Sequence, residues 1–195
     1  MKICLIRHGE TDWNALGKLQ GREDIPLNEH GIQQAETCAE SLKGGEWNAI
    51  FTSPLLRASQ TACIIAGILN IPKMQEEHGF IERDYGKASG TKTSGFSAED
   101  RIALFSDNSM ESLQTLTARL FSALKESVKS RQSENIIIVS HGGAINAILA
   151  KLSAGTIGSG KTQLKNACIN MLEYNGKAFD IVFYNKTAEE LKELL

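Results

Sequence analysis

Residues 3–11 read ICLIRHGET, an apolar run that stops abruptly at an arginine, a histidine and a glycine. The same event occurs again at residues 136–143, where IIIVSHGG leads an apolar run into a serine, a histidine and two glycines. A short apolar run bounded by polar residues is typical of a strand covered on both faces. We therefore expect both histidines at the carboxyl ends of buried strands, where open α/β sheets bind their ligands.

Strand-like and helix-like segments alternate along the rest of the chain. Residues 49–52 predict another strand, and Asn175-Gly176 is a favoured turn pair that joins strands at 168–174 and 179–184 into a hairpin. Capping residues and apolar periodicity predict helices that begin at Asn28, at Ser53 with Pro54, near Glu111, near Gly143 and at Thr187. Residues 73–109 are less regular and should form loops and short helices.

Two of these helices have an apolar side that can be read directly from the spacing of their residues. In the helix that begins at Asn28 these residues are Ile32, Ala35, Ala39 and Leu42. In the helix that begins near Glu111 they are Leu113, Leu116, Leu120 and Leu124. Alternating strands and helices predict an α/β fold in one domain over residues 1–195. We expect a three-layer α/β/α sandwich with a mostly parallel central sheet and an antiparallel edge strand.

The bulk composition excludes several classes of protein. The 195 residues include 21 basic and 23 acidic side chains, a balance that argues against nucleic acid or a membrane surface as the partner. No segment approaches the roughly 20 apolar residues of a membrane helix, so a cytoplasmic protein is expected. The four cysteines are scattered without a CxxC pair, which predicts buried reduced thiols and no zinc site.

Several cationic groups should converge at one edge of the predicted sheet. Arg7 and His8 follow the first strand, His141 follows a later one, and Arg57 lies in the first turn of a helix after another strand. Such a cluster is costly without an anion, and arginine matches the geometry of phosphate bidentately. The other two histidines, His30 and His78, have polar neighbours and are expected at the surface.

The order of motifs resembles the histidine phosphatase superfamily, also called phosphoglycerate mutase-like. The resemblance covers most of the chain and rests on LIRHGETDWN (5–14), QG (20–21), DIPLNEHG (24–31), TSPLLRASQTA (52–62), IERDYG (81–86) and VSHGG (139–143). The IERDYG segment and the short middle region look most like the small bacterial broad-specificity phosphatases. The expected ligand is a small phosphorylated metabolite. The resemblance implies no metal and no cofactor, and the oligomeric state stays unknown.

The resemblance also implies roles for individual residues. His8 would be the nucleophile that accepts the phosphoryl group on one ring nitrogen, while the other nitrogen donates to a backbone carbonyl. The phosphoryl oxygens would be bound by Arg7, Arg57, His141, Asn14 and the backbone amide of Gly142, with Gln20 and Gly21 as further substrate contacts. Glu82 would be the proton donor, although Glu76, Glu77 and Asp84 are nearby alternatives.

The same chemistry serves phosphatases and phosphoglycerate mutases. The mutases of the family carry a longer insertion with paired arginines for the substrate carboxylate, whereas Gly86–Met110 holds only Arg101. Little sequence follows the last predicted strand that could form a lid. These features favour a phosphatase, with a mutase as the alternative. An inactive scaffold that binds phosphorylated partners is a third possibility, which nothing in the sequence favours.

Residues Gly155–Thr162 read GTIGSGKT and match the pattern of a nucleotide-binding P-loop. A P-loop needs a buried strand directly before it and a helix directly after it. Here a predicted helix precedes the motif and a strand-like segment follows it. We therefore expect a flexible surface loop, with a P-loop nucleotide-binding protein as a remote alternative.

Overall fold

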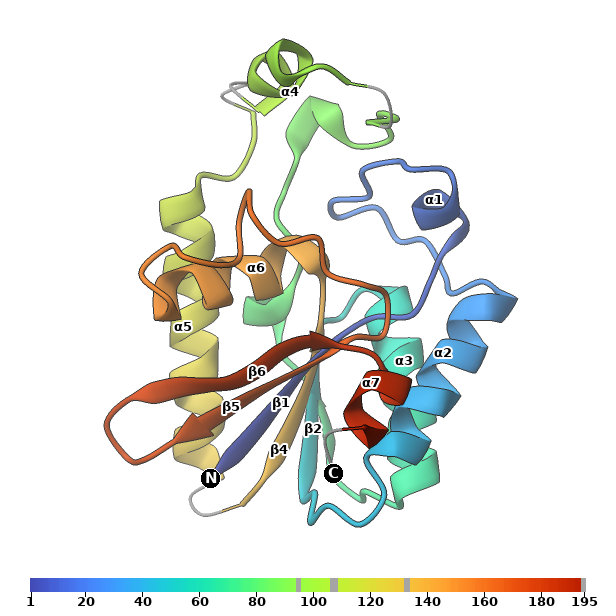
Figure 1. The fold of residues 1–195 in the computed structure, drawn as a ribbon, viewed down its shortest axis with the longest axis vertical. Coiled ribbons are helices and arrows are strands. Elements are labelled where there is room, and N and C mark those ends of the chain that lie inside the picture. Colours follow the sequence, from blue (N-terminus) through green and yellow to red (C-terminus); the bar gives the residue numbers. More distant parts are fainter. Residues whose placement is uncertain (94–95, 106–108, 132–133, 194–195) are drawn as a thin grey trace.

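The computed structural model describes residues 1–93, 96–105, 109–131 and 134–193. Its centre is a six-stranded sheet in the order β3-β2-β4-β1-β5-β6 (Figure 1). The strands in that order are Met74–Glu76, Ala49–Thr52, Ile136–Ser140, Lys2–Arg7, Ile169–Tyr174 and Phe179–Lys186. The first four strands are parallel, and β5 runs antiparallel to both β1 and β6. The predicted mixed sheet and its antiparallel hairpin edge are confirmed.

Helices cover both faces of the sheet, as Figure 1 shows. One face carries α2 (Glu29–Ser41), α3 (Leu56–Leu69) and α7 (Ala188–Lys192), and the other carries α5 (Leu113–Ser130) and α6 (Gly142–Leu152). Alternate residues of β1 enter the two cores, since Ile3 and Leu5 join one and Cys4 and Ile6 the other. The short elements are α1 (Asp12–Ala15), η1 (His78–Phe80), η2 (Gly86–Ala88) and α4 (Ala98–Phe105).

The predicted helix starts are confirmed with one exception. The side chain of Asn28 accepts a hydrogen bond from Gly31 N, and Thr187 forms a capping box with Glu190. Ser53 is not the N-cap of α3, because Leu55 occupies that position and the helix begins at Leu56. The Ser53 hydroxyl instead lies within hydrogen-bond distance of the ring of His141.

Four expectations about exposure and local structure were wrong. Ile32 and Leu113 are exposed because each lies in the first turn of its helix, before the stretch whose side chains enter the core. Cys63 is exposed on α3, whereas the other three thiols are buried, and all four cysteines are free thiols. Strand β3 was not expected because its three side chains are all exposed and carry no alternating pattern.

No helix in the described part of the chain is long and apolar enough to cross a membrane.

The segment after β1 packs backbone against backbone on the start of α2. Asn28 N donates to Glu10 O at 3.0 Å, and a Cβ atom built on Gly31 would lie 2.1 Å from that same oxygen. A Cβ atom on Gly9 would lie 2.3 Å from Gly31 O. The two glycines therefore allow the chain that follows His8 to sit directly on the helix.

We expect Gly31→Ala to lower the free energy of unfolding by about 1–3 kcal/mol, because the methyl group would force the two backbones apart. Gly67→Ala is the matched control, since an added Cβ on that helical glycine meets nothing within 4 Å. The control should be stabilising by up to about 1 kcal/mol. Urea unfolding measures both, and equal effects would contradict the close backbone contact.

Candidate active site

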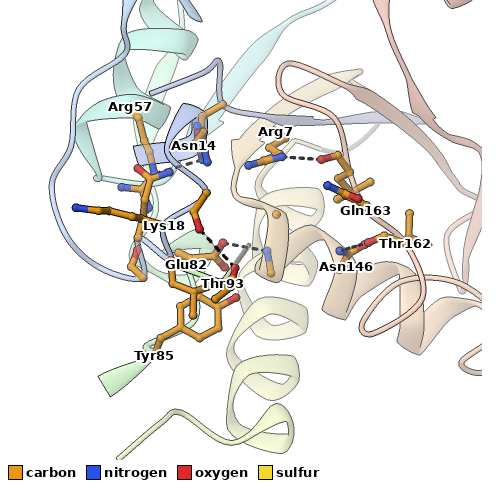
Figure 2. A pocket seen from close by; sticks show the side chains of 18 of the residues that line it. Arg7, Asn14, Lys18, Arg57, Glu82, Tyr85, Thr93, Asn146, Thr162 and Gln163 are labelled. Carbon is orange, nitrogen blue, oxygen red and sulfur yellow. Dashed lines mark hydrogen bonds between the residues drawn. The ribbon is translucent and has the colours of Figure 1, made fainter. Parts of the chain in front are cut away.

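A polar pocket of about 670 Å³ opens at the carboxyl ends of β1 and β4. Figure 2 shows Arg7, Asn14, Arg57 and Glu82 around it, with Thr162 and Gln163 on the side opposite Arg57. The structure brings together all the predicted site residues. Those that line the pocket are Arg7, His8, Asn14, Gln20, Gly21, Arg57, Glu82 and Gly142. His141 is fully buried beside them, and its ring centroid lies 5.2 Å from that of His8.

The hydrogen bonds of His8 determine which ring nitrogen carries its proton. Nδ1 lies 2.6 Å from the carbonyl oxygen of Gly9, and Arg57 Nε donates to Nε2 at 3.3 Å. Because a guanidinium group only donates, Nε2 must present its lone pair and Nδ1 must hold the proton. The predicted bond from His8 to a backbone carbonyl is confirmed. The imidazole therefore offers a nucleophilic Nε2 beside a cation.

Arg57 is a buried cation and Arg7 a half-buried one, and backbone carbonyls hold both side chains. Arg57 donates from Nη1 to Glu23 O at 2.7 Å and from Nη2 to Gly21 O at 2.8 Å, and burial lowers its pKa to about 10. Arg7 donates from Nη1 to Leu164 O at 2.6 Å, while its buried Nε has no partner among the described residues. A buried and a half-buried cation beside an unpaired N–H form a site that an anion would stabilise.

His141 contacts a serine hydroxyl on one side of its ring. Its Nε2 lies 2.7 Å from Ser53 Oγ, and its buried Nδ1 has no partner in the part of the chain that the structure describes. Burial lowers the pKa of both His8 and His141 well below the ordinary value, and nearby Arg57 and Arg7 lower it further. Both imidazoles are therefore neutral at pH 7.

We expect the free energy of unfolding to decrease as the pH falls below about 6.5, the ordinary pKa of histidine. Each buried histidine has a folded-state pKa below that value, so protons bind the unfolded chain first and stabilise it. The stabilisation is complete above about pH 6.5 and is lost as the pH falls toward the folded-state pKa. Urea unfolding at several pH values should show a shallower dependence for His141→Gln than for wild type. Parallel curves would contradict this assignment.

The carboxylate of Glu82 lies at the N-terminus of α6. Its Oε2 accepts from Gly143 N at 2.9 Å, and its Oε1 accepts from Ala144 N at 2.9 Å and from Arg83 N at 2.8 Å. A Cβ atom at position 143 would come within 2.7 Å of Glu82 Oε1, so the second glycine of SHGG permits this approach. The side chain is buried and lines the pocket.

The three alternative carboxylates are placed elsewhere. Asp84 forms an ion pair with Arg22 at 3.6 Å and its side chain is 43% exposed. Glu76 is exposed on the edge strand β3, and Glu77 accepts from Gly79 N at 2.8 Å. None of the three lines the pocket. Glu82 is the candidate acid that the geometry favours.

The comparison with known proteins agrees with this arrangement. The model of the histidine phosphatase superfamily (branch 1) matches residues 3–187. The chain belongs to the histidine phosphatase superfamily. The phosphatase branch is supported by an uncharacterized phosphatase PhoE of Bacillus subtilis, 41% identical over 94% of this chain and 93% of its own length. These matches identify the protein as a phosphatase of that superfamily.

Other relatives carry more specific names. A metal-independent phosphoserine phosphatase of Arabidopsis thaliana is 34% identical over 88% of this chain and 75% of its own length. A probable phosphoglycerate mutase GpmB of an Enterobacter species is 30% identical over 89% and 85%. The solved structure of a mutant phosphoserine phosphatase from Entamoeba histolytica in complex with phosphoserine superposes with a TM-score of 0.82. It is 28% identical and covers 100% of this chain and 99% of that one.

Within this histidine phosphatase, Asn14 is held by a network that the sequence did not reveal. Its Oδ1 accepts from Thr11 N at 3.2 Å, from Thr11 Oγ1 at 3.1 Å and from Asn166 Nδ2 at 3.1 Å. Because a backbone N–H can only donate, the amide orientation is fixed, and the NH₂ group of Asn14 is left to serve the pocket. Asn166 also donates to His8 O at 3.3 Å, so it joins two predicted site residues.

The GTIGSGKT segment is a surface loop, as expected, and its Gly160, Lys161 and Thr162 form a wall of the pocket. Lys161 Nζ donates to Gly155 O at 2.6 Å, and Asn146 Nδ2 donates to Thr162 O at 2.9 Å. The helix α6 precedes the segment, so the strand that a P-loop requires is not there. The P-loop alternative is therefore wrong for this histidine phosphatase.

His30 and His78 are exposed, as expected. Gln20 is buried against the pocket, and its Oε1 has no partner among the described residues. The Arg101 side chain, which entered the comparison with mutases, lies outside the described residues. Tyr85, which sequence reasoning did not single out beyond its motif, lines the pocket beside Glu82.

Proposed function

We propose that the protein hydrolyses small phosphate monoesters through a phosphohistidine intermediate on His8, with Glu82 as the proton donor and no metal. The observation that carries this proposal is the fixed tautomer of His8, whose Nε2 lone pair faces the buried Arg57. The positive charge for a phosphate comes from Arg7 and Arg57. No group of three or more side chains that could hold a metal occurs in the described part of the chain.

In the first step, His8 Nε2 attacks phosphorus while the bond from phosphorus to the alcohol oxygen breaks. A protonated Glu82 gives its proton to that oxygen, so a neutral alcohol leaves. Arg7, Arg57 and His141 hold the phosphoryl oxygens and offset their charge in the transition state. The Asn14 amide and the Gly142 N–H add further donors to these oxygens.

In the second step, water attacks the phosphohistidine in line with the bond between Nε2 and phosphorus. The Glu82 carboxylate takes a proton from that water, the Nε2 lone pair returns to His8, and inorganic phosphate is released. The three backbone N–H groups that contact the Glu82 carboxylate hold it in place at the N-terminus of α6.

For the substrate, we propose a phosphorylated metabolite of the size of phosphoserine. The relatives named phosphoserine phosphatase and the neighbour bound to phosphoserine support this choice. The outer pocket is lined by polar groups that suit a polar leaving group, among them Lys18, Thr93, Asn146 and Gln163. A phosphoglycerate mutase is the second candidate, which the relative named GpmB favours.

The test compares wild type with His8→Ala on nitrophenyl phosphate, phosphoserine and 3-phosphoglycerate, all in excess chelator. Free phosphate from wild type alone would support the metal-independent histidine mechanism. Isomerised phosphoglycerate without phosphate release would move the protein to the mutase class. Loss of wild-type turnover in chelator, restored by a divalent cation, would contradict the metal-free step.

We expect Arg57→Ala to raise the inhibition constant of inorganic phosphate and to lower kcat, each by on the order of 10- to 100-fold, because charged hydrogen bonds are lost. Lys43→Ala is the matched control, since it removes a positive charge from an exposed ion pair with Glu40. Steady-state kinetics with phosphate as inhibitor measure both constants. Equal inhibition constants for the two variants would remove Arg57 from the phosphate site.

A further inference from the structure

The contact between Ser53 and His141 lies behind the pocket and is completely buried. Both residues have no exposed surface, and Ser53 Oγ lies 2.7 Å from His141 Nε2. Ser53 follows β2 directly, and its backbone N donates to Val139 O of β4 at 3.0 Å. The hydroxyl is thereby fixed by two neighbouring strands of the sheet.

Accounting for the protons distinguishes the two neutral tautomers of His141. Ser53 Oγ already accepts a hydrogen bond from Leu55 N at 3.3 Å. If His141 carried its proton on Nε2, Oγ would accept again, and the hydroxyl hydrogen would have no acceptor among the described residues. The lone pair of Nδ1 would also be unpaired, since that atom has no partner among the described residues. Two buried polar groups would then be unsatisfied.

The other tautomer leaves a single group unsatisfied. The Ser53 hydroxyl donates to Nε2, and the proton of His141 is on Nδ1. That N–H is then the one side-chain group of the pair without a partner among the described residues, and a phosphoryl oxygen is a suitable acceptor for it. The ring lies 5.2 Å from that of His8 between centroids, so the His141 imidazole is next to the nucleophile.

We propose that Ser53 is a positioning residue that keeps His141 in the tautomer with the proton on Nδ1, so that neutral His141 donates to a phosphoryl oxygen. The donation to phosphate rests on the proposed function, whereas the tautomer does not. A charged His141 ring would be destabilised at this place, because the buried Arg57 and the half-buried Arg7 already supply two positive charges. Ser53 thus lets a third donor act without a third charge.

The direct test is the ¹⁵N NMR spectrum of the full chain labelled at its four histidines, in buffer without phosphate near neutral pH. His→Gln variants assign the signals. We expect a protonated, pyrrole-type Nδ1 and an unprotonated, pyridine-type Nε2 for His141. The opposite pattern, or two pyrrole-type nitrogens, would overturn the proposal. This measurement needs neither catalytic activity nor a Ser53 variant that folds.

Ser53→Ala then tests the cause. We expect His141 to lose its preference for the Nδ1–H tautomer, and the inhibition constant of inorganic phosphate to rise by on the order of tenfold. Ser127→Ala is the matched control, because it removes a buried hydroxyl that has no partner among the described residues. It should change neither readout.

An unchanged His141 tautomer in Ser53→Ala would overturn the role of Ser53. A changed tautomer with unchanged inhibition by phosphate would overturn the donation to phosphate. Failure of wild type to release phosphate from any monoester would instead contradict the proposed function and leave the tautomer assignment standing.

Discussion

Replacing His8 by alanine is expected to reduce kcat on phosphate monoesters by on the order of 10³ or more, because only binding and charge stabilisation remain. The Nε2 atom of His8 carries no proton, and its lone pair accepts a hydrogen bond from Arg57 Nε at 3.3 Å that the attack on phosphorus must replace. Removing a residue that only bound phosphate would reduce kcat far less. The size of the loss therefore distinguishes a nucleophile from a ligand.

The measurement combines turnover with trapping of the intermediate. Wild type quenched in alkali during turnover of a labelled monoester should carry acid-labile phosphate on the chain, and His8→Ala should carry none. His30→Ala is the control, since His30 is exposed on α2 and does not line this pocket. A labelled His8→Ala chain would place the intermediate on another residue.

Much of the fold could be predicted because the chain separates its strands and helices clearly. The apolar runs at residues 3–6 and 136–139 are buried on both faces, and adjacent parallel strands carry their terminal histidines to one edge. Asn28 and Thr187 cap helices through local contacts, which a sequence shows directly. Strand β3 lacks any such local signal.

The supporting residues of the site could not be predicted, because they act across the fold. Ser53 and His141 are 88 residues apart, and Asn166 and Asn14 are 152 apart. Ser53 resembles an N-cap when only its neighbours Pro54 and Leu55 are considered. The wall formed by Gly160, Lys161 and Thr162 was missed for the same reason, since the hydrogen bond from Asn146 of α6 to Thr162 O forms only in the folded chain.

The choice of Glu82 among four carboxylates also required tertiary structure. Glu76, Glu77, Glu82 and Asp84 are close in sequence, and the family pattern alone selected one of them. The structure separates them by their partners, because only Glu82 accepts from the N-terminus of α6. Glu76 lies on an edge strand, Glu77 accepts from Gly79 N, and Asp84 forms an ion pair with Arg22.

Glu82→Gln is expected to reduce hydrolysis of alkyl phosphates by on the order of 10²- to 10⁴-fold, the usual range for loss of a general acid or base. The loss on nitrophenyl phosphate should be much smaller in the first step, because nitrophenolate leaves without a proton. The variant also loses at least one hydrogen bond to the N–H groups around the carboxylate. All three groups that contact the carboxylate are N–H donors, so the NH₂ of glutamine must face at least one of them.

The experiment therefore needs a control for the structural loss at α6. A series of leaving groups from alkyl to nitrophenyl isolates proton donation, since disturbance of α6 lowers kcat/KM equally across the series whereas loss of the acid increases with leaving-group pKa. Asp84→Asn should leave the whole series unchanged, because Asp84 does not line the pocket. A uniform loss in Glu82→Gln, together with a graded loss in Asp84→Asn, would transfer the role of acid to Asp84. A graded loss in Glu82→Gln alone identifies Glu82 as the group that protonates the leaving alcohol.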